Sequence, residues 1–383
     1  MFKSINRKNT SSYKYDHIEG SYLSFFIADS DYASPKCITD ALIKRAKHPI
    51  YGYTFIDDAY YQSVINWIKR RYHYTIEKHH LIPTSGIVNS LFYALLMLKD
   101  YSDSVVIQTP VYNQFYGLIE STGFKMIENK LINNEGYFTM DLQDLEETFK
   151  KGTKILILCS PHNPVGRVYT HDELQALVLL AKQYNVYILS DEIHCDIILN
   201  GYKFISLNHF YPLYENIITF FSPSKSFNIA GLKTSSTIIL NETLNKKYKA
   251  LIDKHHYGLK NPFSIEGAKA AYTCDQWLDD QNKHLTNNYK IMQEYFKKHK
   301  EVVLTKMEAT YLAWLDLSCL DKSCEVMYEE LLNRGILVSG GKKYADYCEG
   351  FIRINFACDE QQLRKGLDIV SEYIEDSLKE KSQ

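Results

Sequence analysis

Five short apolar runs in the middle of the chain constrain its fold more than any other feature of the sequence. They are rich in β-branched residues and do not alternate apolar with polar positions, which is typical of strands buried on both faces. The runs are Ser104–Gln108, Lys154–Leu158, Val186–Leu189, Ile217–Phe221 and Ser236–Leu240. Helical patterns separate them, and a capping box at Thr170–Glu173 predicts one helix start. This alternation predicts an α/β protein with a three-layer, mostly parallel sheet.

The C-terminal part of the chain has a different pattern. From about Cys274 helical patterns dominate, and the strand candidates alternate apolar with polar residues more clearly. The helical stretches are Ala268–Lys298 and Glu325–Arg334, and the strand candidates are Tyr311–Leu317 and Phe351–Phe356. With 383 residues the chain is long enough for two domains. We expect a large domain of residues 45–274 and a smaller α+β domain of residues 1–44 together with 275–383.

Charge and hydropathy exclude several classes of protein. Lys and Arg total 44 against 46 Asp and Glu, so we expect no nucleic-acid binding by bulk charge. No run approaches the ~20 apolar residues of a membrane helix, and the first ten residues lack a secretory apolar core. The eight cysteines show neither C-x-x-C nor zinc spacing. We therefore expect a cytoplasmic protein with reduced thiols and no metal, in which the pairs His79-His80 and His255-His256 are surface residues.

Chemically active residue types follow the predicted strands where each strand ends. In open α/β sheets ligands bind outside the carboxyl ends of the strands, so these side chains are expected to lie near one another. They are Tyr112, Asn163, Asp191, His194, Ser222, Ser224, Lys225 and Lys233. The segment Pro83–Val88 opens a further helix, and the free N–H groups of a helix start attract an anion.

This set of groups suits pyridoxal phosphate (PLP). A Lys amine forms a Schiff base with the aldehyde of PLP, and a carboxylate keeps the pyridine nitrogen protonated. An aromatic face stacks on the ring, and an amide bonds the phenolic oxygen. Hydroxyls and a helix N-terminus hold the phosphate. The sequence therefore predicts PLP as cofactor.

The ordered motifs resemble a known family. The blocks 163–166 (NPVG), 191–194 (DEIH) and 222–231 (SPSKSFNIAG) are similar to fold-type I PLP enzymes of the class I/II aminotransferase superfamily. More closely, they resemble its cystathionine β-lyase branch (C–S lyases, MalY/PatB-like). Segments 27–31, 51–54, 309–316 and 350–357 also match, so the resemblance covers nearly the whole chain. It implies the PLP-dependent transferase fold.

The resemblance also implies roles for the residues around the cofactor ring. Lys225 is expected to form the Schiff base and to move the substrate Cα proton. Asp191 is expected to pair with the pyridinium nitrogen, and Tyr112 to stack on the ring. Asn163 is expected to bond the phenolic oxygen, and His194 to support Asp191 or that oxygen.

For the phosphate, the resemblance implies backbone N–H groups of Gly86, Ile87 and Val88 and the hydroxyl of Ser222, with Ser224 as a second candidate. Aminotransferases of the superfamily usually place an Arg eight residues after the Schiff-base Lys. Our hypothesis is that Lys233, at that spacing, supplies positive charge to the phosphate.

Arg353 is expected to clamp the substrate α-carboxylate through two parallel hydrogen bonds, with Ala28 and Tyr112 beside the substrate. Tyr53, or its neighbour Tyr51, matches a Tyr that in this family reaches the phosphate of the partner subunit. A homodimer with shared sites is therefore implied.

The implied activity is α,β-elimination on cystathionine or S-substituted cysteines, which gives a thiol, pyruvate and ammonia. One alternative is an aminotransferase that acts on an amino acid and a 2-oxo acid. Another is a PLP-containing regulatory binding protein. Phe26, and residues 339–350 with their Lys pair, depart from the usual pattern of the branch. These departures leave the cofactor residues intact and concern substrate specificity, which depends on such loops.

Overall fold

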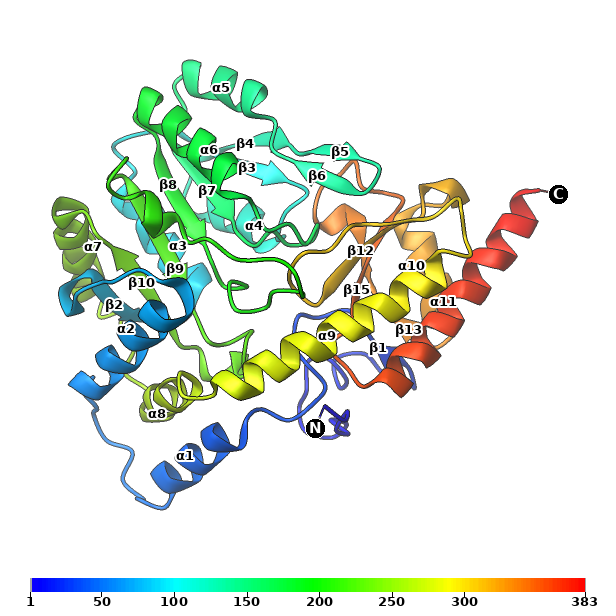
Figure 1. Ribbon diagram of the computed structural model, residues 1–383, viewed down its shortest axis with the longest axis horizontal. Coiled ribbons are helices and arrows are strands. Elements are labelled where there is room, and N and C mark those ends of the chain that lie inside the picture. Colours follow the sequence, from blue (N-terminus) through cyan, green and yellow to red (C-terminus); the bar gives the residue numbers. More distant parts are fainter. Residues whose placement is uncertain (1, 383) are drawn as a thin grey trace.

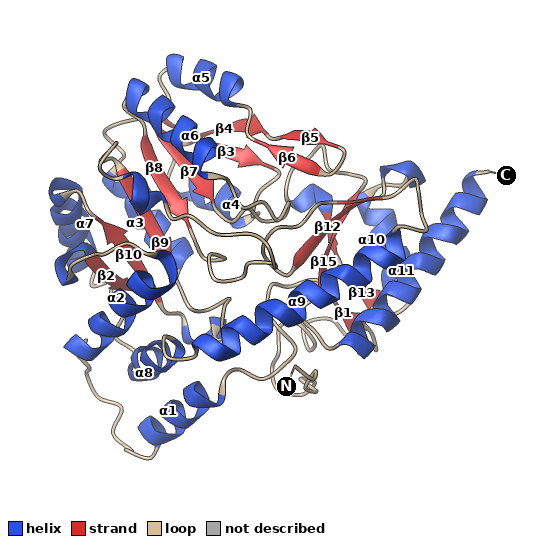
Figure 2. Ribbon diagram, viewed as in Figure 1, coloured by secondary structure: helices blue, strands red, loops and turns tan. Residues whose placement is uncertain are grey.

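A seven-stranded sheet forms the centre of the computed structural model, which describes residues 2–382 (Figures 1 and 2). Its order is β2-β10-β9-β8-β7-β3-β4, and only β10 runs antiparallel to its neighbours. The strands are β2 (Leu81–Thr84), β3 (Ser104–Thr109), β4 (Lys125–Lys130), β7 (Ile155–Cys159), β8 (Tyr187–Asp191), β9 (Ile217–Phe221) and β10 (Ser235–Ile239). The five apolar runs coincide with β3, β7, β8, β9 and β10 within one or two residues, so the predicted α/β class is confirmed.

Helices cover both faces of this sheet. Consecutive residues of β7 point to opposite faces of the sheet and contact different helices. Ile157 packs with helices α3 (Ile87–Met97), α4 (Gln114–Ser121) and α7 (Glu242–Lys254). Leu156 packs on the opposite face with α5 (Leu142–Lys150) and α6 (His171–Tyr184). Because both sets of side chains are buried, the strands need no polar alternation. The capping box at Thr170–Glu173 begins α6 as predicted.

A second, four-stranded antiparallel sheet lies toward the C-terminal end of the chain. Its order is β11-β12-β15-β14. The strands are β11 (Val303–Leu304), β12 (Leu312–Asp316), β15 (Phe351–Asn355) and β14 (Ser339–Gly340). Helices α9 (Asp275–Phe296), α10 (Cys324–Asn333) and α11 (Glu360–Lys381) accompany it.

Both ends of the chain meet at this second sheet. Strand β1 (Leu23–Ser24) pairs in parallel with β13 (Ile336–Leu337), and Figure 1 shows the blue N-terminal segment beside the red C-terminal helix. Phe25 and Tyr32 belong to the same buried cluster as residues of α9, α10 and α11. This arrangement agrees with a smaller unit built from both ends, while its boundaries at residues 44 and 274 stay a prediction.

Several elements differ from the sequence-based expectation. The helical stretch 268–298 is two helices, α8 (Pro262–Ala271) and α9, because the chain leaves helical geometry at Cys274. Helices α1 (Lys36–Ala46) and α2 (Asp58–Tyr72) lie where we predicted no elements. Strand β4 has a polar sequence because it is the exposed edge of the sheet, where burial does not select apolar residues.

The remaining elements are short. Strands β5 (Ile132–Asn134) and β6 (Tyr137–Thr139) form a small antiparallel pair. The 3-10 helices are η1 (Lys78–His80), η2 (Leu207–Phe210), η3 (Ala230–Leu232), η4 (Ser318–Leu320) and η5 (Gly341–Lys343). Within residues 2–382, no helix combines the length and apolar character needed to cross a bilayer.

The expectation that all eight thiols are reduced is wrong for two of them. Cys37 in α1 and Cys274, just before α9, are joined in a disulfide. The other six cysteines are free. The pair is 237 residues apart in sequence. Spacing patterns reveal only local cysteine clusters, so the sequence carried no signal for this bond.

Candidate active site

A cavity of about 310 Å³ lies where the carboxyl ends of the central strands face the second sheet. Most residues expected to form the site line it. They are Ala28, Ile87, Val88, Tyr112, Asn163, Asp191, His194, Lys225 and Arg353. The residues come from segments up to 325 positions apart, since Ala28 and Arg353 share the same space.

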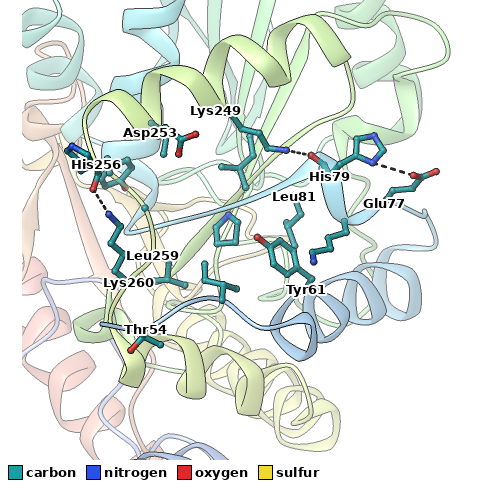
Figure 3. Close-up of a pocket in the computed structure, with 17 residues that line it drawn as sticks. Thr54, Tyr61, Glu77, His79, Leu81, Lys249, Asp253, His256, Leu259 and Lys260 are labelled. Atoms are coloured by element: carbon teal, nitrogen blue, oxygen red, sulfur yellow. Dashed lines mark hydrogen bonds and ion pairs between the residues drawn. The ribbon is translucent and has the colours of Figure 1, made fainter. Parts of the chain in front are cut away.

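A larger cavity of about 660 Å³ lies elsewhere, between β2, α7 and the segment that contains Thr54 (Figure 3). Tyr61, Leu81 and Lys249 line it, and none of the expected site residues does. Its walls hold no combination of nucleophile, buried carboxylate and guanidinium. The residue types that line the smaller cavity therefore make it the candidate active site.

Lys225 follows β9 and projects its amine into the cavity. Its Nζ donates a hydrogen bond of 2.6 Å to the backbone oxygen of Ala28. Burial lowers the pKa of Lys225 to about 8, although the negative charges of Asp29 and Asp191 act in the opposite direction. An amine with a lowered pKa is neutral more often than an ordinary lysine, which makes it a better nucleophile and base.

Asp191 is the last residue of β8. Its Oδ1 accepts a hydrogen bond of 3.0 Å from the backbone N–H of Ile193. Burial raises the pKa of Asp191 to about 7, and the nearby Lys225 opposes the rise. A cation that binds beside this carboxylate would lower its pKa again. The neighbouring Glu192 is occupied differently, because its oxygens accept from Ser190, Ser206 and Leu207.

His194 is fully buried in the wall of the cavity. Its Nδ1 has no hydrogen-bond partner among residues 2–382. Burial, followed by the charges of Lys225 and Arg353, lowers the pKa of His194 to about 3, so the imidazole is neutral. Arg353 Nε is likewise buried without a partner in the described chain. Since buried polar groups are normally paired, these two atoms point to a polar ligand in the cavity.

Arg353 on β15 is only 5% exposed and joins the two sheets. Its Nη1 donates to Asn163 Oδ1 at 3.2 Å, and its Nη2 donates to the backbone oxygen of Phe26 at 2.7 Å. The ring of Tyr344 lies 4.9 Å from the guanidinium carbon. Because Asn163 Oδ1 accepts from Arg353, its amide nitrogen is the atom left to donate to a ligand.

The expected phosphate residues divide into two groups. Ile87 and Val88 line the cavity at the start of α3, where N–H groups lack acceptors within the helix. Gly86 does not line it, and its N–H donates to Ser235 Oγ. Ser222 and Ser224 do not line it either: Ser222 Oγ donates to the backbone oxygen of Thr234 and is hydrogen-bonded to Ser224 Oγ.

Lys233 and Tyr53 are also outside the cavity of their own chain. Lys233 is exposed at the end of η3, with a left-handed backbone. Tyr53 is fully exposed. The proposed phosphate contacts of these two residues therefore stay predictions.

The cavity also contains residues to which the sequence gave no individual role, although Phe26 and the segment 339–350 were connected with substrate specificity. They are Tyr13, Ile27, Asn113, Gln114, Cys159, Ile193, Ser339, Lys343 and Tyr344, together with Phe26. Asn113 and Gln114 directly follow Tyr112, and this proximity was a usable signal. Lys343 and Tyr344 come from η5 and the residue after it, and only tertiary packing brings them to the cavity.

His79 and His80 are packed together rather than pointing apart. Their ring centroids are 4.0 Å apart. The two ring nitrogens of His79 each lie 3.3 Å from a carboxylate oxygen, one on Glu77 and one on Glu242, and Figure 3 shows the contact with Glu77. Glu242 is far from this pair in sequence, so only the tertiary structure brings its carboxylate there. The absence of a bound metal stays a prediction.

The comparisons with known proteins place the chain in a family. The model of the aminotransferase class I and II family matches residues 23–370, and the chain belongs to this family. Over 377 residues it is 32% identical to the cystathionine beta-lyase PatB of Bacillus subtilis (strain 168), with 95% of this chain and 97% of PatB covered.

Solved structures give the same result for the fold. The PLP-bound C-S lyase of Staphylococcus hominis superposes with a TM-score of 0.91 at 33% identity, over 97% of each chain. A PLP-bound structure from Clostridium difficile 630, described as an aminotransferase, superposes with a TM-score of 0.94 at 32% identity. That match covers 97% of this chain and 98% of the other.

Proposed function

We propose that this chain is a PLP-dependent carbon–sulfur β-lyase that acts on cystathionine or S-substituted cysteines. The observation that carries the proposal is that Lys225, Asp191 and Arg353 line one cavity. Relatives over nearly the full length of the chain include a cystathionine beta-lyase and a C–S lyase. The products are a thiol, pyruvate and ammonia.

The residues of the cavity fit PLP. Lys225 offers an amine with a lowered pKa to the aldehyde, and the buried Asp191 offers a carboxylate to the pyridinium nitrogen. Tyr112 offers an aromatic face, and the amide nitrogen of Asn163 is free to donate. For the phosphate we propose the N–H groups of Ile87 and Val88, with Gly86 directly before them in sequence. Ser222, Ser224 and Lys233, which lie close to Lys225 in sequence, are further candidates.

When bound, PLP withdraws electrons from the substrate Cα, which acidifies the Cα–H bond and allows the Cβ–S bond to break. The protein supplies the other parts. Arg353 binds the substrate α-carboxylate through its planar guanidinium and fixes the orientation of the amino acid. The neutral amine of Lys225 takes the Cα proton. Asp191 stays ionised beside a positive ring nitrogen, since an opposite charge lowers the pKa of a carboxylate.

A second candidate is amino-group transfer between an amino acid and a 2-oxo acid. The Clostridium difficile structure described as an aminotransferase supports it. Both reactions begin with the same proton removal by the same groups. The site residues therefore suit either reaction.

Incubating the purified, PLP-loaded protein with L-cystathionine and no 2-oxo acid tests the proposal. A lyase forms pyruvate and free thiol in equal amounts. Conversion that occurs only after a 2-oxo acid is added would contradict the proposal and favour the aminotransferase.

We also propose that the protein is a homodimer in which Tyr53 reaches the cofactor phosphate of the partner. The segment that carries it exposes four large apolar side chains, Ile50, Tyr51, Tyr53 and Phe55. Such a patch is typical of an interaction surface. Tyr51 is held in its own chain, because its hydroxyl donates to the backbone oxygen of Ala46. Tyr53 is therefore the better candidate. The cytoplasmic location stays a prediction.

A further inference from the structure

The charged side chains at the cavity leave one cation without a role. Four lining residues are Asp, Lys or Arg: Asp191, Lys225, Arg353 and Lys343. The first three serve the cofactor and the amino-acid end of the substrate. Lys343, on η5, serves neither.

The backbone around Lys343 is fixed against the large sheet. The backbone oxygen of the next residue, Tyr344, accepts from the N–H of Val111 at 3.1 Å and from the hydroxyl of Tyr116 at 2.7 Å. The Tyr344 ring packs on the guanidinium of Arg353. A Cβ at Gly341 would lie 2.3 Å from the backbone oxygen of Cys348, so the chain passes here through a space that only glycine fits. The backbone of Lys343 is therefore fixed next to Tyr344, whose ring contacts the guanidinium of Arg353.

The two adjacent lysines of this turn differ in their partners. Lys342 is neutralised by Glu349 at 2.7 Å and Glu325 at 3.5 Å. Lys343 has no carboxylate within 4.0 Å in the described chain. Lys342 is absent from the cavity lining, whereas Lys343 is part of it. Lys343 is exposed, so the solvent-facing edge of the cavity, its mouth, carries a positive charge without a carboxylate partner in the described chain.

The other residues at the mouth suit a chain that is apolar along its length and polar at its end. Tyr13 and Phe26 provide an aromatic wall, with ring centroids 6.0 Å apart. Asn113 and Gln114 add amide groups beside it. A thioether chain can lie against the aromatic rings while its terminal group meets amides and the Lys343 ammonium.

We propose that Lys343 binds a carboxylate at the distal end of the departing thiol. The preferred substrates are then cysteine S-conjugates in which the departing thiol carries a carboxylate at its distal end. This inference rests on the proposed lyase function. In the elimination Lys225 takes the Cα proton, the Cβ–S bond breaks and sulfur keeps the electron pair. Lys343 takes no part in bond breaking and acts only on the distal carboxylate.

The test compares S-(2-carboxyethyl)-L-cysteine with S-propyl-L-cysteine, which has nearly the same length and no distal charge. The ratio of their kcat/KM values is measured for the PLP-loaded wild type and for Lys343→Met, Lys343→Glu and Lys342→Met. An ion pair at an exposed site changes this ratio by up to ~5-fold. We expect that loss in Lys343→Met, a larger loss in Lys343→Glu and no change in Lys342→Met. Added salt should reduce the wild-type ratio, because it screens exposed charges.

An unchanged ratio in both Lys343 variants, or an equal loss in Lys342→Met, would overturn the inference. Calorimetric binding of the same two amino acids separates this outcome from failure of the proposed function. If no pyruvate forms from either compound, the lyase proposal fails, while the binding ratio of wild type to Lys343→Met still tests the Lys343 contact.

Discussion

Arg353 Nη1 donates a hydrogen bond of 3.2 Å to Asn163 Oδ1 and so links the two sheets at the cavity. Arg353 lies on β15 of the smaller sheet, and Asn163 follows β7 of the central sheet. The bond orients both side chains at once. It turns the guanidinium toward the cavity and leaves the amide nitrogen of Asn163 as a donor. Two predicted ligand contacts therefore depend on one hydrogen bond.

Replacing Arg353 with Lys tests the carboxylate clamp. The charge remains, but the planar fork that binds a carboxylate through two bonds is lost. A charge-assisted hydrogen bond contributes about 1.5–3 kcal/mol, so we expect kcat/KM for L-cystathionine to fall ~10- to 100-fold, mainly through KM. Arg334→Lys is the matched control, because Arg334 pairs with Asp376 on the surface. A normal KM in Arg353→Lys would exclude Arg353 as the clamp.

Asp191→Asn tests the counter-ion of the ring nitrogen. The amide has the same shape but cannot stabilise a positive nitrogen, so electron withdrawal from the substrate weakens. We expect kcat to fall ~100-fold or more, the scale found for losing one electrostatic contact in a transition state. The protein should still bind PLP, as its visible absorbance will show. Asp172→Asn, on the exposed start of α6, should retain full activity. A kcat near wild type in Asp191→Asn would refute the role.

Lys225 gives a prediction about pH. Only a neutral amine attacks the PLP aldehyde, and the pKa of Lys225 is lowered to about 8. The rate of PLP uptake by the apoprotein should therefore rise with pH and level off above pH ~8, whereas an ordinary lysine reaches its plateau only above pH ~10. Stopped-flow absorbance measures this rate. Lys225→Ala should show neither turnover nor the visible absorbance band of PLP joined to a lysine. A rate that still rises steeply at pH 10 would mean that the Lys225 amine is not the one that reacts.

Tyr53→Phe tests the shared site of the proposed dimer. Light scattering should give twice the 44.6 kDa chain mass for both wild type and variant. Removing the hydroxyl should weaken PLP affinity about tenfold, because one hydrogen bond to a charged phosphate is lost. Tyr51→Phe is the control, since its hydroxyl bonds within its own chain. A monomeric wild type, or equal effects of the two variants, would contradict the arrangement.

The disulfide between Cys37 and Cys274 gives a prediction about stability. It closes a loop of 237 residues and so restricts the unfolded chain strongly. Long-loop disulfides typically add about 2–4 kcal/mol to the free energy of unfolding. We expect Cys37→Ser to lower the melting temperature by several degrees. Dithiothreitol should lower the melting temperature of the wild type to that of the variant. If the reductant affects wild type and variant equally, the bond does not form in solution.

Local sequence patterns were sufficient for the core of the fold. Runs such as Ile217–Phe221 are buried at every position because both faces of their strands are covered, so apolar residues dominate them and the pattern can be read from the sequence. The pattern failed where burial is incomplete or the chain bends. Strand β4 is an exposed edge with a polar sequence, and the stretch 268–298 gave no sign of the break at Cys274 between α8 and α9.

The sequence by itself determined the buried parallel strands and the reactive groups that follow them, Tyr112, Asn163, Asp191 and Lys225. Strand order and direction bring such groups to one edge of a sheet, so their convergence was predictable. Only the tertiary structure decided the bond between Arg353 and Asn163, the position of Lys343 at the mouth of the cavity and the pairing of Cys37 with Cys274. Each depends on packing between segments more than a hundred residues apart. Local sequence periodicity contains no information about contacts between residues so far apart in the chain.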